Sequence, residues 1–497
     1  MLATVSSLFE RLDDAGVRYC HWKSNWALAV TLDGKTDLDL LVSRDDASSY
    51  RRILQDLGFR PAVQHGAEPF PAVEHHHALD DPTGTLVHVH SYYRVISGGS
   101  LAKNYHLPLE EMLLRDVRRE VTVNVPSRGA ELIVFVLRMS LKHATMAELV
   151  LVRRDWENVR REAAWLVTDE ARAEAEALLP AWLPAFDPGL FADARDALAA
   201  PASIVRRVVL GRRVRAALRP YARRGRLRAW FAEAGAFSGK ALSRWRGSTK
   251  RLSPSAGGAV IAFVGPEATG KSTLLADAES WLGAHFTVRR VHAGKPPSTF
   301  LTAVPNLLLP ALRSLFPGQR STRVTANLAH LAPDLEERAA IQSAKPFPML
   351  FGIRSVLLAH DRRTLLTRAY ARAANGAIVL SDRYPSVEPG AVDGAQLGHH
   401  RGPAPRGALR RRLAALEARL YRDIPPPDLV VYLTAPLEVA LERNRERGKS
   451  EPESYVLSRH ARSSSLEFER TTVHRLATDR PLDEVTSELR RVIWSTL

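Results

Sequence analysis

Residues 265 to 272 read GPEATGKS, and these residue types at this spacing suit the binding of a phosphate chain. The glycines let backbone N–H groups turn inward around an anion, and a helix that begins near Lys271 directs its positive end to the same place. The Lys271 ammonium would reach the β- and γ-phosphates, and the Ser272 hydroxyl would ligate Mg²⁺. The alternative is an ordinary glycine turn between a strand and a helix. We predict that ATP binds to Gly265, Pro266, Glu267, Ala268, Thr269, Gly270, Lys271, Ser272 and Thr273.

A second group of charged residues follows the apolar run GAIVLS, where the chain continues Asp382-Arg383-Tyr384-Pro385. An acid at the carboxyl end of a buried strand lies beside the phosphate loop in a doubly wound sheet. There Asp382 would hold Mg²⁺ or orient an acceptor, and Arg383 would bind an anionic acceptor. The alternative is a surface ion pair at a turn.

Other users of such loops carry further motifs that this sequence lacks. It has no LSGGQ-like segment, no NKxD and no DExx after a strand, which argues against a transport ATPase, a GTPase and a helicase. Of the classes that use such loops, the kinases remain.

A third segment, PDLVVYLTAPLEVALERNRERGKS at residues 427–450, concentrates arginines after a buried strand. Such arginines would close over the nucleotide and stabilise the charge that develops on a transferring phosphoryl group. On this basis we predict catalytic roles for Arg443 and Arg447. The alternative is a solvated helix with Glu–Arg pairs.

These segments occur in an order that resembles the thymidylate kinase family of nucleoside-monophosphate kinases. The resemblance covers most of residues 259–470 and includes the segment Ala359-His360-Asp361-Arg362. It implies that the loop and the arginine-rich lid bind ATP–Mg²⁺. It also implies catalytic roles for Lys271, Asp382, Arg383 and Arg362, with metal binding by Ser272 and Asp382 and acceptor binding by the two arginines.

The sequence departs from that family on the acceptor side. The family has Asp then Gly in the loop, where this chain has Glu267-Ala268. After the next strand the family has Arg-Glu-Pro-Gly, where this chain reads HAGKPP from His292. The stretch 296–345 has no clear family counterpart. We therefore expect the phosphoryl-transfer chemistry to be retained on a rebuilt acceptor side, so the resemblance does not carry thymidylate specificity over to this chain.

In the front half, Asp37-Leu38-Asp39 lies in a β-rich run. Alternate residues of a strand point the same way, so both carboxylates can bind one metal ion. The pattern resembles the nucleotidyltransferase superfamily, in which a Gly-Ser turn binds a triphosphate and strand carboxylates hold two metal ions. Lys23 stands in place of that Gly. We predict that Asp37 and Asp39 are metal ligands, in either an altered transferase or a binding module that keeps the fold.

Histidines are frequent in the same region, at positions 65, 75, 76, 77, 88 and 90. His88 and His90 occupy the strand on which a third acid is expected. Together the histidines could form a metal site. The alternative is a solvated turn.

The net charge of +16 is concentrated in one segment. Residues 201–251 hold fifteen Lys or Arg and a single acid, Glu233. We therefore predict a basic helical connector rather than a uniformly basic protein. Basic residues beside aromatic ones can bind an anionic membrane surface, with nucleic acid ranked behind it. The alternative is a solvated helical linker.

The sequence carries one cysteine, Cys20, so no internal disulfide can form, which favours a reducing compartment. No stretch approaches the roughly 20 apolar residues that span a bilayer. The N-terminal MLATVSSLFERLDD has the pattern of an amphipathic helix. We expect a cytoplasmic protein, peripheral to the membrane if the connector binds one.

The predicted fold class is α/β. A mixed α+β nucleotidyltransferase-like domain with a helical extension spans residues 1–200, and the basic connector spans 201–255. Buried apolar runs separated by helical patterns predict a kinase domain with a parallel sheet at 256–497.

The predicted function is an ATP- and Mg²⁺-dependent phosphotransferase for a small nucleotide, sugar or related acceptor. Three alternatives stay open. They are a front-half nucleotidyltransferase with a regulatory second half, a polynucleotide 5′-kinase, and a membrane-recruited assembly protein that hydrolyses ATP slowly.

Overall fold

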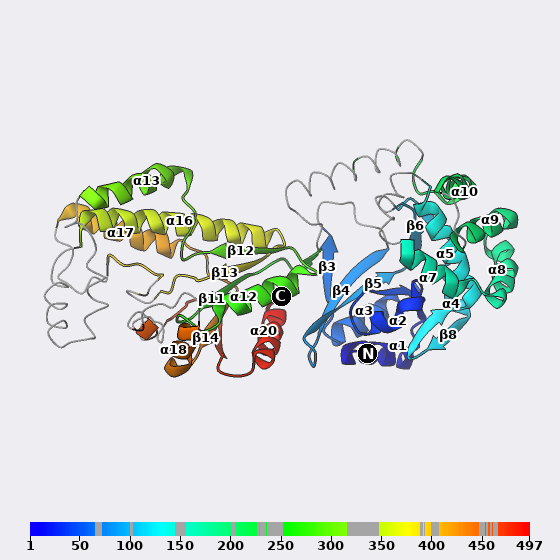
Figure 1. Ribbon diagram of the computed structural model, residues 1–497, viewed down its shortest axis with the longest axis horizontal. Coiled ribbons are helices and arrows are strands. Elements are labelled where there is room, and N and C mark those ends of the chain that lie inside the picture. The colour runs from blue at the N-terminus through cyan, green and yellow to red at the C-terminus, as the bar shows by residue number, and fades with distance from the viewer. Residues whose placement is uncertain are drawn as a thin grey trace. The chain divides into compact units, whose positions relative to one another are not determined.

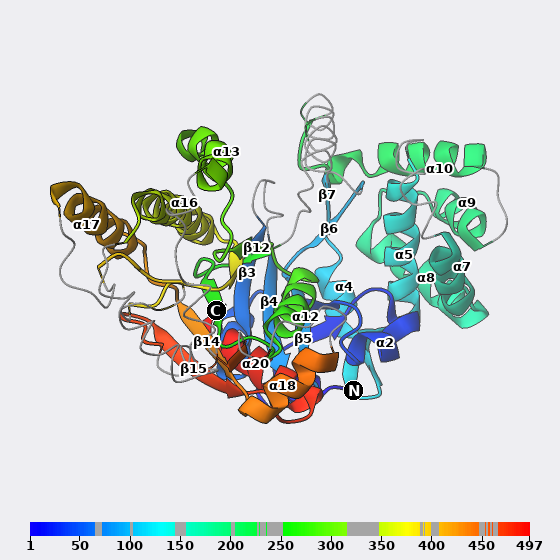
Figure 2. The ribbon, with the colours of Figure 1, turned by 60° about the vertical axis from the view of Figure 1, so that its left-hand side comes forward.

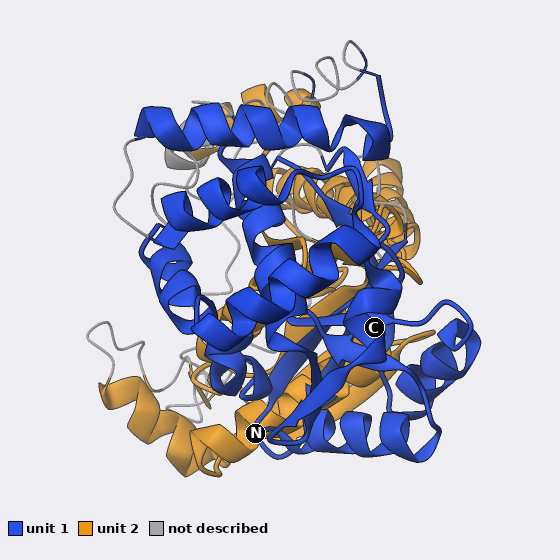
Figure 3. Cartoon of the chain, turned by 90° about the vertical axis from the view of Figure 1, so that its right-hand side faces the viewer, with its two compact units in different colours: residues 1–250 blue, residues 251–497 orange. Residues whose placement is uncertain are grey.

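The computed structural model describes residues 1–64, 72–99, 103–144, 156–199, 204–225, 252–315, 347–387, 393–398, 407–446 and 466–497, and single positions 228, 235, 391, 453, 456, 457 and 460. The chain divides into two compact units, residues 1–250 and 251–497 (Figure 3). Each unit has its own sheet and its own hydrophobic core.

The first unit combines a mixed sheet with a group of helices (Figure 1). Its sheet-forming part contains α1 (Ala3–Asp14), β1 (Tyr19–His21), a 3-10 turn (Asn25–Ala27), α2 (Leu28–Leu32), β2 (Leu38–Val42), α3 (Ala47–Asp56), β3 (Arg60–Gln64), β4 (Val73–Asp80) and β5 (Thr85–Tyr92). The rest contains β6 (Val95–Ser97), β7 (Tyr105–Leu107), α4 (Glu110–Arg115), β8 (Val117–Glu120), β9 (Val123–Pro126), α5 (Arg128–Lys142), α7 (Trp156–Leu166), α8 (Asp169–Trp182), α9 (Pro188–Ala199), α10 (Ile204–Ala217) and a 3-10 turn (Arg219–Tyr221).

The first sheet runs in the order β1-β2-β5-β4-β3, with β2 and β5 parallel and the other neighbours antiparallel. One face is apolar and packs against α1 and α3 through Leu40, Val87 and Val89. Successive side chains of a strand point to opposite faces, so the residues between these apolar positions share the other face. Asp39, His88 and His90 are among them.

The helical part of the first unit is organised around α5, nearly all of whose residues are buried. Helices α7, α8, α9 and α10 pack around it and bury a continuous apolar core (Figure 1). Gly211 of α10 fits tightly here, because a Cβ would lie 2.6 Å from the Ser140 carbonyl oxygen.

The second unit contains β10 (Leu252–Pro254), β11 (Val260–Val264), α12 (Lys271–Gly283), β12 (Val288–His292), α13 (Phe300–Leu315), α16 (Met349–Ala374), β13 (Ile378–Asp382), α17 (Ala408–Arg422), β14 (Leu429–Thr434), α18 (Leu437–Glu446), β15 (Thr472–Ala477) and α20 (Leu482–Thr496). Its sheet is parallel throughout and runs β12-β13-β11-β14-β15. The central strand β11 is buried along its whole length.

Helices cover both faces of this parallel sheet. Figure 2 shows α12 and α20 on one side, with α16, α17 and α13 on the other. On the α16 side, Leu366, Ala369 and Ala373 pack against alternate residues of β11 and β13. Burial on both faces explains why these strands read as continuous apolar runs.

The predicted α/β fold class is confirmed. The runs 38–42, 85–90, 259–264, 376–381 and 428–434 all form strands, and the N-terminal amphipathic pattern forms α1. The second sheet is parallel, as the apolar runs indicate.

The basic segment 201–255 is described only in part. Within it, α10 buries Leu210 and Val214 in the first unit's core, and Arg207 lies over the Trp156 ring at 3.8 Å. Residues 204–225 therefore belong to the first compact unit. The aromatic residues at 230, 231, 237 and 245 lie outside the described residues, and membrane binding by this segment stays a prediction. Within the described ranges, no helix combines the length and apolarity needed to cross a bilayer.

Candidate functional site

The segment 265–270 forms the turn between β11 and α12, at the carboxyl end of the central strand. Gly265 has a φ of 141° and Gly270 a φ of 82°, which glycine adopts more readily than other residues. Ala268 has a φ of 63°, in the left-handed region, at the position where the thymidylate kinase family has glycine. Ala268 thus holds a left-handed backbone conformation that glycine adopts at lower cost.

Lys271 begins α12 and is buried, with 8% of its surface exposed. Its ammonium donates to the Gly265 carbonyl oxygen at 3.0 Å and to the Pro266 carbonyl oxygen. The side chain thus lies across the loop that it follows. Ser272 and Thr273 are exposed in the first turn of the same helix.

Asp382 is brought beside the loop by sheet pairing. It ends β13 opposite Phe263 of β11, and it pairs with His292 of β12 on its other side. The His292 Nδ1 lies 3.0 Å from the Asp382 Oδ2. Asp382 and the loop 265–270 therefore lie together at the carboxyl ends of neighbouring strands, which suits the predicted Mg²⁺ role of Asp382.

Arg383 follows Asp382 with a φ of 73° and forms two ion pairs. Its guanidinium lies 2.7 Å from Glu267 Oε1 in the loop and 3.4 Å from Asp393 Oδ2. Burial alone would lower the pKa of Arg383, but the charges of Asp393 and Glu267 outweigh burial and raise it. Gly294 makes room for this side chain, because a Cβ there would lie 2.5 Å from the arginine Cδ.

Arg362 of α16 is buried, with 4% of its surface exposed. It donates to the Ala293 carbonyl oxygen and to the Tyr421 hydroxyl, each at 2.8 Å. It also binds Asp393, through the carbonyl oxygen at 2.8 Å and the carboxylate at 2.9 Å. Arg362 and Arg383 therefore share one carboxylate, that of Asp393.

The predicted lid arginines are only partly described. Arg443 of α18 donates to the Thr478 carbonyl oxygen at 2.6 Å and to its hydroxyl at 3.3 Å, which ties α18 to the end of β15. Arg445 pairs with Glu453 at 2.7 Å on the surface. Arg447 lies outside the described residues. The described contacts of Arg443 are therefore structural ones, and its catalytic role stays a prediction.

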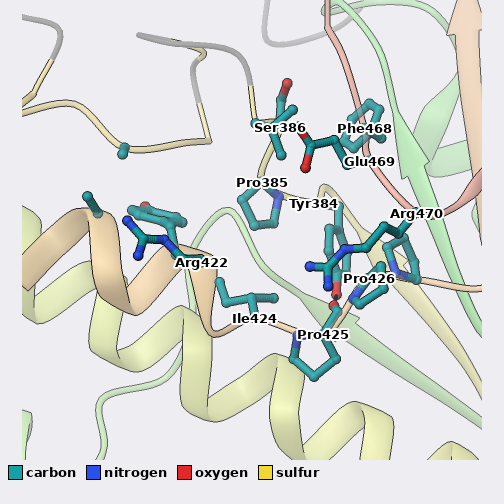
Figure 4. Close-up of a pocket in the computed structure, with 15 residues that line it drawn as sticks. Tyr384, Pro385, Ser386, Arg422, Ile424, Pro425, Pro426, Phe468, Glu469 and Arg470 are labelled. Atoms are coloured by element: carbon teal, nitrogen blue, oxygen red, sulfur yellow. Dashed lines mark hydrogen bonds between the residues drawn. The ribbon is translucent and has the colours of Figure 1, made fainter.

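A cavity of 310 Å³ begins at the residues that follow Arg383 (Figure 4). Aromatic and prolyl residues contribute much of its lining, together with two arginines, one acid and several aliphatic residues. The aromatic, prolyl and charged members are Tyr384, Pro385, Tyr421, Arg422, Pro425, Pro426, Pro427, Phe468, Glu469 and Arg470. Tyr421 also accepts the hydrogen bond from Arg362. The cavity therefore adjoins the group formed by Arg362, Arg383 and Asp393. Burial raises the pKa of the Tyr421 hydroxyl, which therefore stays protonated at neutral pH.

In the first unit, the structure brings Asp37 and Asp39 together with histidines. The Asp37 Oδ1 lies 2.8 Å from His88 Nδ1, and the Asp39 Oδ1 lies 3.3 Å from His90 Nδ1. Lys23 adds an ion pair with Asp39 at 2.8 Å. Strand β5 therefore places an imidazole beside each of the two carboxylates.

The sequence patterns missed three contacts at these sites. Asp393 and Tyr421 lie in segments with no motif, and only the fold brings them to Arg362. The pairing of His292 with Asp382 follows from the β12–β13 register, which the sequence does not specify. The histidines at 75 to 77 lie in strand β4, so the alternative of a solvated turn is wrong for them.

No family model matches the chain. Over 88 residues it is 40% identical to a probable thymidylate kinase of Archaeoglobus fulgidus, covering 16% of this chain and 45% of that protein. Over 245 residues it is 25% identical to the uncharacterized ATP-binding protein YghR of Escherichia coli, covering 47% of this chain and 86% of that protein.

The match to the thymidylate kinase thus spans less than half of that protein's length. Neither relative has a name that refers to nucleotidyl transfer, and the resemblance of the front half stays a prediction. The chain is similar, in part, to a protein named as a thymidylate kinase and to one named for ATP binding.

Proposed function

We propose that the second unit is an ATP- and Mg²⁺-dependent phosphotransferase. The observation that carries the proposal is that the loop 265–270 and Asp382 lie together at the carboxyl ends of two neighbouring parallel strands, β11 and β13. In this arrangement Lys271 stabilises the charge on the transferring phosphoryl group, while Ser272 and Asp382 organise Mg²⁺. The partial similarity to an ATP-binding protein and to a thymidylate kinase supports the same chemistry.

The acceptor is a small molecule with an anionic group. Arg362 and Arg383 already hold one carboxylate, that of Asp393, so their geometry suits a phosphate or carboxylate on the acceptor. An anionic acceptor would exchange with Asp393 at these guanidinium groups. The adjoining cavity, with its aromatic and prolyl lining, would take the uncharged part of the acceptor.

The test is ADP production from ATP–Mg²⁺ by the full chain, measured with four classes of acceptor. They are nucleoside monophosphates, sugar phosphates, uncharged sugars and 5′-hydroxyl oligonucleotides. We expect stimulation by one of the two phosphorylated classes. Lys271→Ala should lower the stimulated rate by at least about 100-fold, because it removes a donor to the developing charge. Arg368→Ala, on an exposed position of α16, is the matched control and should leave the rate unchanged.

Three results would count against the proposal. ATP binding without stimulation by any acceptor would remove the phosphotransferase. Stimulation by uncharged sugars alone would keep the kinase but remove the anionic acceptor. Stimulation by oligonucleotides would favour the polynucleotide 5′-kinase instead.

A further inference from the structure

Six polar side chains gather on one face of the first unit's sheet, opposite the face that packs against α1 and α3. They come from the start of β2, from β4 and from β5, and they are Asp37, Asp39, His75, His77, His88 and His90. The strand register brings them together, since His75 pairs with His90 and His77 pairs with His88. His90 also lies opposite Asp39.

We propose that His75, His88 and His90 bind a divalent transition-metal ion through ring nitrogens. Their possible ligand atoms all lie within 4.8 Å of one another. The His75 Nδ1 lies 3.2 Å from the His88 Nε2. Tetrahedral Zn²⁺ with Zn–N bonds of about 2.0–2.1 Å separates its ligand atoms by roughly 3.3 Å, so this pair already has the required spacing.

Two carboxylates hold the rings in the orientation that metal binding needs. The Nδ1–H of His88 donates to Asp37 at 2.8 Å, and the Nδ1–H of His90 donates to Asp39 at 3.3 Å. Each contact fixes one tautomer, in which Nε2 is the ring nitrogen that would ligate a metal ion. Without metal, the His88 Nε2 contacts the His75 Nδ1 at 3.2 Å, and a bound ion would replace that contact. A carboxylate behind a histidine ligand is the common outer arrangement of protein metal sites.

Packing holds the same rings in place. The His77 ring stacks on His88 with centroids 4.1 Å apart and an angle of 9° between the planes. The His90 ring stands edge-on to both His88 and His75. Burial and the neighbouring His90 and His88 lower the pKa of His75 to about 3, so its ring is neutral at pH 7. Neutral imidazole is the form that binds metal.

The donor set identifies the class of metal. Imidazole nitrogens favour Zn²⁺, Fe²⁺, Co²⁺, Ni²⁺ or Cu²⁺, whereas Mg²⁺ and Ca²⁺ prefer oxygen ligands. This site therefore differs from the paired-carboxylate Mg²⁺ site that the nucleotidyltransferase resemblance implies. The Asp37 side chain is 47% exposed, so the cluster is open to solvent on that side. Water or an external anion would supply the fourth ligand.

The test is a calorimetric titration of the untagged full chain with Zn²⁺ after treatment with a chelator. We expect one Zn²⁺ per chain at this site. His88→Gln, which removes a ligand, should weaken binding by more than about 100-fold. Asp37→Asn, which removes only an orienting group, should weaken it by about 10–100-fold. His76→Gln is the matched control, because His76 neighbours His75 in β4 but points to the face covered by α1.

Substitution with Co²⁺ gives a second readout, since tetrahedral Co²⁺ absorbs visible light far more strongly than octahedral Co²⁺. We expect strong absorption in the wild type and in His76→Gln, and its loss in His75→Gln. Circular dichroism of each metal-free variant checks folding, and if His88→Gln unfolds, His75→Gln and Asp37→Asn carry the test.

Equal Zn²⁺ affinity in the wild type and in the folded ligand variants would overturn the proposal. Binding of Mg²⁺ with no binding of Zn²⁺ would overturn it as well. The outcome of the Zn²⁺ titration is independent of the proposed phosphotransferase activity. We expect Lys271→Ala to bind Zn²⁺ with the affinity of the wild type.

Discussion

The loop 265–270 of the second unit comes from one continuous segment, whereas the histidine cluster of the first unit comes from separate strands. The histidine cluster is the set Asp37, Asp39, His75, His77, His88 and His90. The loop is one continuous segment of backbone, and sheet pairing brings Asp382 beside it from a neighbouring strand. The histidine cluster takes its side chains from three strands, and its geometry depends on their register. A loop formed by consecutive residues can be recognised from the local sequence. A cluster of side chains on the face of a sheet can be recognised only when the pairing of the strands is known.

The two sites also differ in how their charges are balanced. Arg362 and Arg383 are fully charged groups that hold acidic side chains, which an incoming anion can replace. The imidazoles of the first unit are held by carboxylates, which under the proposed metal binding would remain as orienting groups. The first arrangement suits exchange of anions, and the second suits a cation.

The largest effect is expected from a substitution that disturbs the backbone of the loop 265–270. In Gly265→Ala the new Cβ would lie 2.4 Å from the Leu433 carbonyl oxygen, at a φ of 141°. We expect the free energy of unfolding of the second unit to fall by about 3 kcal/mol. Gly257→Ala is the matched control, with a φ of 104° and no atom within 4 Å, and should cost about 1 kcal/mol. Equal losses in urea unfolding would contradict the steric explanation.

For the histidine cluster, the corresponding test removes His75 and measures how the free energy of unfolding depends on pH. Unfolded His75 binds a proton near pH 6.5, but folded His75 does so only near pH 3. Between these values the unfolded chain binds more protons, so the free energy of unfolding rises with pH and falls on acidification. The contribution is at most about 1.4 kcal/mol per pH unit.

His75→Gln should therefore flatten the stability profile between pH 4.5 and 6.5 in the absence of metal. Urea unfolding of both proteins in the presence of a chelator measures the two slopes. A slope in the variant as steep as in the wild type would show that His75 does not titrate in this way.

The smallest effect is expected from a substitution of Asp393, whose carboxylate an anionic acceptor would replace at Arg362 and Arg383. Asp393→Asn leaves the shape of the side chain but removes the carboxylate that Arg362 and Arg383 share. We expect KM for the anionic acceptor to fall by about tenfold, which corresponds to about 1.4 kcal/mol. An unchanged KM together with a lower melting temperature would instead give Asp393 a purely structural role.

Much of the second unit could be predicted from sequence, because its strands are buried on both faces and its loop is contiguous. Apolar runs identify β11, β13 and β14 without any knowledge of pairing. The doubly wound arrangement then places Asp382 beside the loop. The partners of Arg362 could not be predicted, since they come from segments whose positions only the packed chain determines.

In the first unit, the sequence identified the residue types but not their arrangement. Asp37 and Asp39 suggested a carboxylate pair, yet β5 places an imidazole beside each of them. Which histidines of the run 75–77 face this site depends on the β4–β5 register. A similar limit applies to Arg443, whose contact with Thr478 needs α18 and β15 to be placed together.

The hairpin between β4 and β5 has a consequence for changes in chain length. A one-residue insertion in β4 after His77 would turn His75 and His77 to the opposite face and bring His76 to the face of the cluster. Because three histidines are consecutive, either alignment of the strand presents an imidazole opposite β5. The run would therefore keep an imidazole opposite β5 after such an insertion, which a single histidine would not.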